Sequence, residues 1–275
     1  MIMEPLFHLR TKTQLDNYLM SPSHGLLLTG PDGSGKLFTA KWIAETLAAD
    51  LLIIAATESK TAITIEQIRE LYSITRTGKK LVAVIKEAHN MSKEAQNAFL
   101  KLLEEPPKNT IFILTATSSE ALLSTIKSRS QQIEILPSPV KALLEIDTEL
   151  APEEVMSLLH TTQQLTGKFS SLLKDEDLRR DWLDKVSEAK KFYSTSPYKR
   201  HLLCIEYKYD RKWALELLQI LAVIVHSLLK QGTSTPPHNK RLLKQAKLIE
   251  STAQNLTVVN GNPKIHLTKL CERLD

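Results

Sequence analysis

The segment Gly30-Pro-Asp-Gly-Ser-Gly-Lys36 constrains the fold more than any other stretch of this 275-residue chain. It follows a short apolar run at residues 25–29 and precedes a helical pattern at residues 39–49. A GxxxxGK loop between a strand and a helix turns its backbone N–H groups inward around phosphate oxygens, and the helix N-terminus adds positive potential. We therefore expect a phosphate site here. Its expected residues are Gly30, Gly33, Gly35 and Lys36.

Strand-like and helix-like patterns alternate around this loop. Buried strands are predicted at residues 25–29, 51–56, 80–85, 110–115 and 132–136. Helices are predicted between them at residues 39–49, 64–75 and 92–105. Thr64 with Gln67, and Ser92, are typical N-terminal helix caps, and a proline pair ends the third helix. Strands separated by helices predict a parallel sheet covered on both faces.

The pattern changes at residues 137–139, where Pro-Ser-Pro predicts a linker. No strand is predicted beyond it. Helices are predicted at 152–164, 169–173, 175–193, 197–207, 212–230, 239–255 and 263–273, with a loop at 232–237. We therefore expect an α/β module at residues 1–137, a small helical lid at 138–190 and a helical collar for oligomerisation at 191–275.

Composition excludes several classes of protein. With 42% hydrophobic and 24% charged residues, the chain is neither collagen-like nor wholly disordered. Its longest apolar runs, such as residues 217–225, are shorter than the roughly 20 residues of a membrane helix, and no secretory signal is expected. The two cysteines, Cys204 and Cys271, lack the spacing of a zinc site. We expect a reducing, cytoplasmic setting and no membrane contact.

Charge is distributed unevenly along the chain. Residues 1–189 hold 21 Lys and Arg against 25 Asp and Glu, whereas residues 190–275 hold 15 against 6. A basic C-terminal third is typical of a surface that meets an acidic partner or nucleic acid. A solvated, lysine-rich helical surface fits the same numbers equally well.

The metal ligands of a working nucleotide hydrolase are missing. The residue after Lys36 should be Ser or Thr, whose hydroxyl binds Mg²⁺, but it is Leu37. The third strand should end in Asp-Glu, but it ends in Lys86-Glu87, and a cation opposes metal binding. We expect no metal and no required cofactor, with weak binding of ATP or phosphate through the loop. The alternative is that Lys86 points away and is a neutral surface residue.

Three further segments identify a family. Residues 87–107, EAHNMSKEAQNAFLKLLEEPP, resemble the signature of the AAA+ clamp-loader ATPases, which open sliding clamps onto primed DNA. Ser128-Arg129-Ser130 resembles the family's Ser-Arg-Cys motif, with Ser130 replacing the cysteine. Residues 114–117 lie where the family keeps its sensor-1 residue. The resemblance is specific over about residues 20–136. It implies an AAA+ P-loop module followed by a helical lid and collar.

Other departures from the active subunits point to a non-hydrolysing member. Gly167-Lys-Phe-Ser170 lies at the family's Gly-Ser-x-Arg sensor-2 motif, and Ser170 replaces the arginine. The four-cysteine zinc module of the active bacterial subunit is absent. The resemblance then implies a stator that donates Arg129, next to Ser128, as an arginine finger to a neighbouring subunit. Its implied partners are ATPase subunits of the gamma/tau type and a delta-like subunit, with the sliding clamp and primed DNA contacted indirectly.

Alternatives remain for the chain and for single residues. The chain also fits an active gamma/tau-type ATPase with an atypical metal site, or a stand-alone nucleic-acid binding protein that uses the basic collar. Arg129 also fits a surface salt bridge at a helix end. Glu104 and Glu105 fit a helix end whose carboxylates face solvent or a neighbouring subunit, and His89 fits a structural role.

Overall fold

The computed structural model describes residues 6–56, 62–75, 78–120, 122–144, 148, 150–230, 236–257 and 262–274. The chain forms two compact units. The first contains residues 1–149 and 164–170, and the second contains residues 150–163 and 171–275. The division into three domains, with boundaries after residues 137 and 190, stays a prediction.

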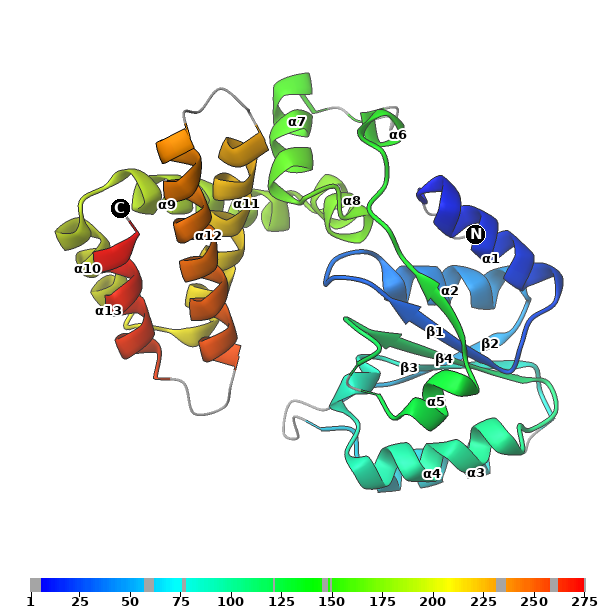
Figure 1. Ribbon diagram of the computed structural model, residues 1–275. Coiled ribbons are helices and arrows are strands. Elements are labelled where there is room, and N and C mark those ends of the chain that lie inside the picture. The colour runs from blue at the N-terminus through cyan, green and yellow to red at the C-terminus, as the bar shows by residue number, and fades with distance from the viewer. Residues whose placement is uncertain are drawn as a thin grey trace. The chain divides into compact units, whose positions relative to one another are not determined.

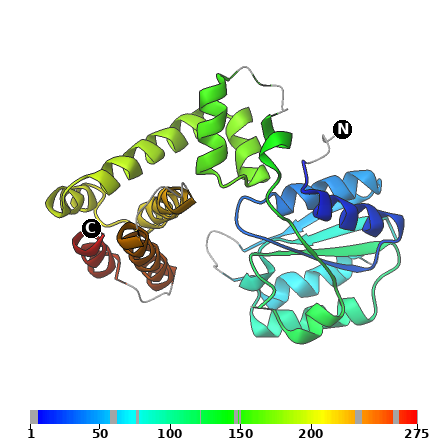
Figure 2. The ribbon, with the colours of Figure 1, turned by 45° about the horizontal axis from the view of Figure 1, so that its top comes forward.

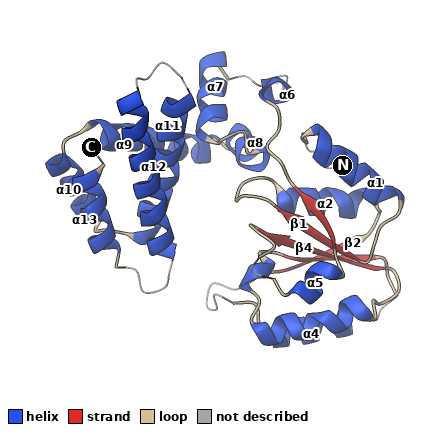
Figure 3. Ribbon diagram, viewed as in Figure 1, coloured by secondary structure: helices blue, strands red, loops and turns tan. Residues whose placement is uncertain are grey.

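A five-stranded parallel sheet forms the centre of the first unit (Figure 3). Its strands are β1 (Gly25–Thr29), β2 (Asp50–Ile54), β3 (Leu81–Ile85), β4 (Thr110–Ala116) and β5 (Gln131–Glu134). They lie in the order β2-β3-β4-β1-β5, so β1 is flanked by two strands that come much later in the chain. All five predicted strands are present, with bounds that differ by at most two residues. The predicted α/β class with a parallel sheet is confirmed.

Helices cover both faces of this sheet (Figure 1). They are α1 (Leu9–Met20), α2 (Lys36–Thr46), α3 (Ile65–Thr75), α4 (Lys93–Glu104) and α5 (Ser124–Ser128). Leu26 and Leu28 of β1 pack on the face covered by α1 and α2, whereas Leu27 packs on the face covered by α3, α4 and α5. Every residue of β3 is buried, which explains its uninterrupted apolar sequence.

Local capping explains where these helices begin. The Thr64 N–H donates to Gln67 Oε1 at 3.0 Å, and Ser92 Oγ accepts from the Ala95 N–H at 3.1 Å, which confirms both predicted caps. Helix α2 begins at Lys36, three residues before its predicted start, because left-handed Gly35 (φ 95°) ends the loop directly before it. Helices α1 and α6 (Val140–Leu144) were not predicted.

The second unit is helical throughout its described residues. Its helices are α7 (Pro152–Thr161), α9 (Glu176–Ser194), α10 (Pro197–Glu206), α11 (Arg211–Lys230), α12 (Pro236–Thr257) and α13 (Pro263–Arg273). Figure 2 shows α11, α12 and α13 lying side by side. Helix α8 (Thr166–Lys174) begins in the first unit and ends in the second. The predicted loop at 232–237 is too long, because Pro236 and Pro237 open α12, where proline is tolerated.

A buried arginine joins three of these helices. The Arg200 guanidinium donates to the carbonyl oxygens of Phe192 at 3.0 Å, Tyr193 at 3.1 Å and Cys271 at 3.3 Å. Two of these carbonyls lie in the last turn of α9, where helix carbonyls lack intrahelical partners. Next to it, Cys204 and Cys271 are free thiols in contact, with 3.6 Å between their sulfur atoms.

Helix α11 corrects one expectation from the sequence. A 19-residue stretch, residues 211–229, is long and apolar enough to cross a membrane by length and composition alone. The count of uninterrupted apolar residues missed it, because isolated polar residues interrupt the stretch. Here Leu218, Leu221 and Val225 are buried, and α11 packs against α9 and α12, so part of its apolar surface is covered within the helical unit.

Candidate nucleotide-binding site

The phosphate loop lies at the carboxyl end of β1, the edge where open parallel sheets bind ligands. Gly30, Gly33 and Gly35 have φ values of 146°, 82° and 95°. These values lie in the left-handed region, which residues with a Cβ rarely adopt. The glycines of the GxxxxGK pattern are therefore required by the backbone conformation of the loop.

Lys36 is turned back onto its own loop. Its ammonium group donates to the carbonyl oxygens of Gly30 at 2.7 Å and Pro31 at 2.9 Å, and lies 3.8 Å from the Asp32 carboxylate. Burial lowers the pKa of Lys36, and the charges of Asp32 and Glu87 oppose that shift. Lys36 is therefore held by the loop itself, and Glu87 lies close enough to affect the pKa of its ammonium group.

Neither residue at the expected metal positions offers an oxygen ligand. The Leu37 side chain packs against the apolar cluster between α2 and the sheet. The Lys86 ammonium group lies 3.4 Å from the Glu87 carboxylate, and both side chains are 44% exposed. Lys86 thus contacts Glu87 while remaining partly exposed. No group of three or more His, Cys, Asp or Glu side chains is placed to hold a metal ion among the described residues. The donor set at this edge does not fit a magnesium ion.

Glu87 has an unusual backbone conformation directly after β3. Its φ of 53° lies in the left-handed region, which is uncommon for residues other than glycine and occurs often at functional sites. The Glu87 N–H donates to Thr115 Oγ1 at 3.0 Å, and Asn90 donates to the Glu87 carboxylate at 3.3 Å. Thr115 belongs to the predicted sensor-1 run, so the structure brings this run against Glu87. His89 Nδ1 is buried without a hydrogen bond among the described residues.

The predicted sensor-2 segment packs directly on the phosphate loop. The Lys168 N–H donates to the Gly33 carbonyl at 2.8 Å. A Cβ added to Gly167 would lie 2.7 Å from both Cα and N of Gly35 and 2.8 Å from the Gly33 carbonyl oxygen. Such distances are too short for any side-chain atom. Gly167 therefore lets two backbone segments touch, as only glycine permits.

Arg129 lies away from this loop, at the other end of β1. It caps the C-terminus of α5 and precedes β5, whose residue Gln131 pairs with Leu26 of β1. The phosphate loop begins after Thr29, so the five residues of β1 separate the two sites by about 16 Å. Ser128 Oγ donates to the Thr125 carbonyl at 3.1 Å. The structure thus separates Ser128 and Arg129 from the phosphate loop of the same chain.

The Arg129 guanidinium is held by two other segments. Nη2 lies 2.8 Å from Glu104 Oε1, and Nη1 donates to the Thr125 carbonyl at 3.3 Å. This is the surface salt bridge that the sequence also allowed. Glu104 was expected to face solvent or a neighbouring subunit, but it pairs with Arg129 of its own chain. No local sequence pattern predicts this pairing, because 25 residues separate the two positions.

Gly25 brings the Arg129 segment close to β1. A Cβ on Gly25 would lie 2.9 Å from the Arg129 carbonyl oxygen and 3.0 Å from the Leu103 side chain. Next to it, the buried Ser130 hydroxyl has no hydrogen-bond partner among the described residues. An unpartnered buried hydroxyl is unfavourable, whereas the thiol of the family's cysteine tolerates burial better. Gly25 is a second residue whose role the sequence did not indicate.

Fold and loop together define the class of protein. A GxxxxGK loop after a central parallel strand, with a helical segment packed on it, is the nucleotide module of a P-loop protein. A crystal structure of a DNA polymerase III gamma subunit-related protein from Thermotoga maritima has the same fold. Its TM-score is 0.61 at 20% identity, covering 95% of this chain and 97% of that one.

Sequence comparisons place the chain more narrowly. The family model for "DNA polymerase III, delta subunit" matches residues 43–139. The delta' subunit of DNA polymerase III from Pseudomonas aeruginosa is 29% identical over 174 residues, covering 53% of this chain and 53% of that protein. The tau subunit from Bacillus subtilis is 32% identical over 151 residues, covering 45% and 27%. The chain is thus similar in sequence to subunits of DNA polymerase III. It spans about half, or less, of the length of these curated relatives.

Replacing Gly167 tests the contact between the sensor-2 segment and the loop. Helix propensity alone makes Gly167→Ala favourable by up to about 1 kcal/mol. We expect the opposite sign, a loss of about 1–3 kcal/mol in the free energy of unfolding, because the new methyl group overlaps Gly35. Urea denaturation of the purified chain measures this. A Gly167→Ala protein as stable as the wild type, or more stable, contradicts the contact.

Proposed function

We propose that this chain is a delta-prime-like stator subunit of a DNA-replication clamp loader, one that does not hydrolyse ATP. In this role it lends Arg129 to the ATP site of a neighbouring subunit. The contact between Lys86 and Glu87 carries the proposal, because it puts a cation where a hydrolase needs a metal-binding carboxylate. Leu37 supports it independently by replacing the hydroxyl ligand.

The place of Arg129 in the sheet supports donation to another chain. A guanidinium at the amino end of β5 lies the full length of β1 from its own phosphate loop. An arginine side chain spans less than half of those roughly 16 Å. Arginine suits the proposed task because it is always charged and contacts two phosphate oxygens at once.

The family relationship also supports the wider setting. Relatives named delta', gamma and tau are all subunits of DNA polymerase III. We therefore propose gamma/tau-like ATPase subunits and a delta-like subunit as partners, joined through the helical collar, with the clamp and primed DNA reached through them. A cytoplasmic location belongs to the same proposal.

An active ATPase of the gamma/tau type is the second candidate. Its support is the identity with relatives named gamma and tau, which at 32% is slightly higher than that with the delta' relative. The two candidates differ in whether this chain turns over ATP. The chemistry of Leu37 and Lys86 favours the stator.

ATP turnover by the isolated chain separates these candidates. We expect the wild type to hydrolyse ATP no faster than Lys36→Ala, because no metal ligand is in place to make the lysine useful. A coupled phosphate-release assay at saturating Mg²⁺ measures both proteins. Clear turnover in the wild type that disappears in Lys36→Ala establishes the active ATPase.

Nucleotide binding gives a separate test of the metal site. We expect weak ATP binding, held by backbone N–H groups, with an affinity that changes less than about threefold when Mg²⁺ is removed. Titration calorimetry with ATP in Mg²⁺ and in EDTA measures the difference. Tight binding that requires Mg²⁺ contradicts our account of Leu37 and Lys86.

Arg129→Ala tests the arginine finger. We expect this variant to fold and to assemble with its partners, yet to slow their ATP hydrolysis, by up to the 10³–10⁵-fold of other arginine fingers where no second finger compensates. Arg129→Lys should be nearly as slow, because ammonium lacks the planar pair of donors. The measurement is clamp- and DNA-stimulated ATPase of the reconstituted complex, with gel filtration for assembly.

A matched control is available two residues earlier. Lys127→Ala removes one positive charge from the last turn of the same short helix. It should leave partner ATPase unchanged. Equal rates for Arg129→Ala and Lys127→Ala in an intact complex reduce Arg129 to a structural residue.

A further inference from the structure

The contact between Glu104 and Arg129 joins two segments that the sequence singles out separately. Glu104 is the last residue of α4, and Arg129 is the C-terminal cap of α5. Glu104 Oε1 lies 2.8 Å from Arg129 Nη2, the distance of a charge-assisted hydrogen bond. The Glu104 and Arg129 side chains are 48% and 39% exposed, so the pair lies at the surface of the first unit.

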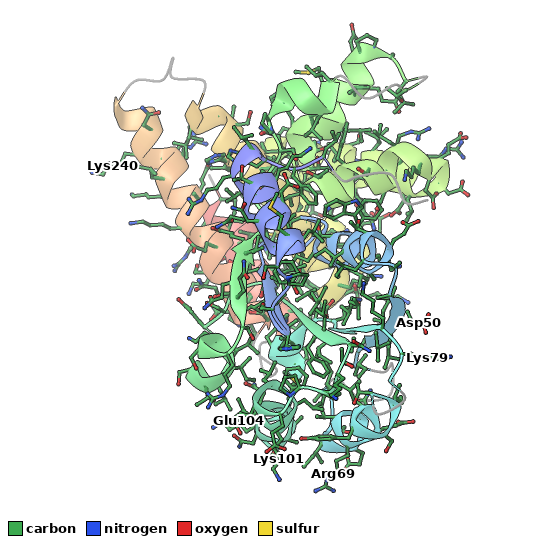
Figure 4. All side chains as sticks on the ribbon, turned by 90° about the vertical axis from the view of Figure 1, so that its right-hand side faces the viewer. Asp50, Arg69, Lys79, Lys101, Glu104 and Lys240 are labelled. Carbon is green, nitrogen blue, oxygen red and sulfur yellow. The ribbon has the colours of Figure 1, made fainter. Side chains whose placement is uncertain are left out.

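Glu104 is directed to this contact by its position on α4. Figure 4 labels it at the end of α4, near α5, whereas Lys101, one turn earlier, points away into solvent. Helix α4 stops at Glu104 because Pro106 and Pro107 follow. Glu104 is therefore the last residue whose direction the helix sets, and this direction brings it to Arg129. Glu105, the next residue, makes no ion pair among the described residues.

The contact restrains the guanidinium without using all of its donors. One N–H on Nη2 goes to Glu104 and one on Nη1 goes to the Thr125 carbonyl. A guanidinium carries five N–H groups. Among the described residues, the Nε–H and a second hydrogen on each Nη have no acceptor. Arg129 is thus oriented at two points while keeping a set of donors for phosphate oxygens.

We propose that Glu104 is a positioning residue that orients the Arg129 guanidinium toward the ATP of a neighbouring subunit. This role rests on the proposed arginine-finger function of Arg129. Without the carboxylate, only one backbone carbonyl holds a side chain with four rotatable bonds. The guanidinium must then lose its rotational freedom when the transition state forms. This entropic cost raises the activation free energy and slows ATP hydrolysis.

The size of the effect follows from the exposure of the pair. Surface ion pairs are weak, so loss of Glu104 removes orientation but not the arginine. We expect Glu104→Gln in the reconstituted complex to lower the kcat of partner ATP hydrolysis by about threefold to fivefold. The KM for ATP should stay within about twofold, because the interaction acts mainly on the transition state.

Two variants make this measurement specific. Glu105→Gln removes the same charge one residue away and should leave kcat unchanged. Glu104→Asp keeps a carboxylate on a shorter side chain and should recover part of the loss. A loss of fold or assembly is checked by gel filtration of each complex.

A second measurement uses the full chain without partners. Phenylglyoxal modifies exposed arginines, and mass spectrometry reports the extent of modification at Arg129. An ion-paired guanidinium reacts more slowly, so Glu104→Gln should speed modification at Arg129 by about twofold or more. Glu105→Gln should not.

The outcomes separate the inference from the function on which it rests. A slow Arg129→Ala complex together with unchanged kcat in Glu104→Gln overturns the positioning role alone. Equal effects of Glu104→Gln and Glu105→Gln overturn it too, because they indicate a general loss of charge. An unchanged rate in Arg129→Ala overturns the proposed function, and the positioning role with it.

Discussion

The parallel pairing of β1 with β4 on one side and β5 on the other fixes where the candidate site residues lie. Parallel strands bring all their carboxyl ends to one edge of the sheet, so Gly30 after β1, Glu87 after β3 and the end of β4 meet there. The same pairing puts the residues before β5 at the opposite edge, beside Gly25. One short strand therefore separates a phosphate loop from an exposed arginine, and a single module presents one candidate site element at each edge.

At the carboxyl edge, the loop binds the ammonium group of its own lysine. The Lys36 ammonium group is already bonded to two loop carbonyls at 2.7 and 2.9 Å, and the Lys168 N–H is bonded to Gly33. A phosphate entering this loop must compete with those internal bonds for Lys36. In a loop with a bound metal, the metal's charge would help it do so. Leu37 and Lys86 provide no metal ligand, so only the backbone N–H groups of the loop are left to attract the phosphate.

Most of the fold could be predicted from the sequence, because its signals are local. The buried apolar runs gave all five strands, and the caps at Thr64 and Ser92 gave two helix starts. Helix α1 was missed although its buried Thr11, Leu15 and Tyr18 have helical spacing, since most of its other residues are polar. The predicted start of α2 was three residues too late, because Lys36 was assigned to the loop and not to the helix. The division of the helical half into lid and collar depends on contacts between distant segments, which no local pattern encodes.

The same distinction applies to the candidate site: residues within local motifs could be predicted, and contacts between distant segments could not. The loop glycines, Leu37 and Lys86 could be recognised because each stands within a motif of fixed spacing. The contacts of Gly25, Gly167 and Glu104 could not, because each of these residues acts on a segment distant in sequence. Gly167 touches a loop more than 130 residues earlier, and its only requirement is the absence of a side chain. Glu104 is one of two adjacent glutamates, and its position on the last turn of α4 brings it, and not Glu105, to Arg129. The direction that a helix gives each side chain thus distinguishes two equivalent charges in the sequence: Glu104 is ion-paired with a distant segment, and Glu105 is the helix cap.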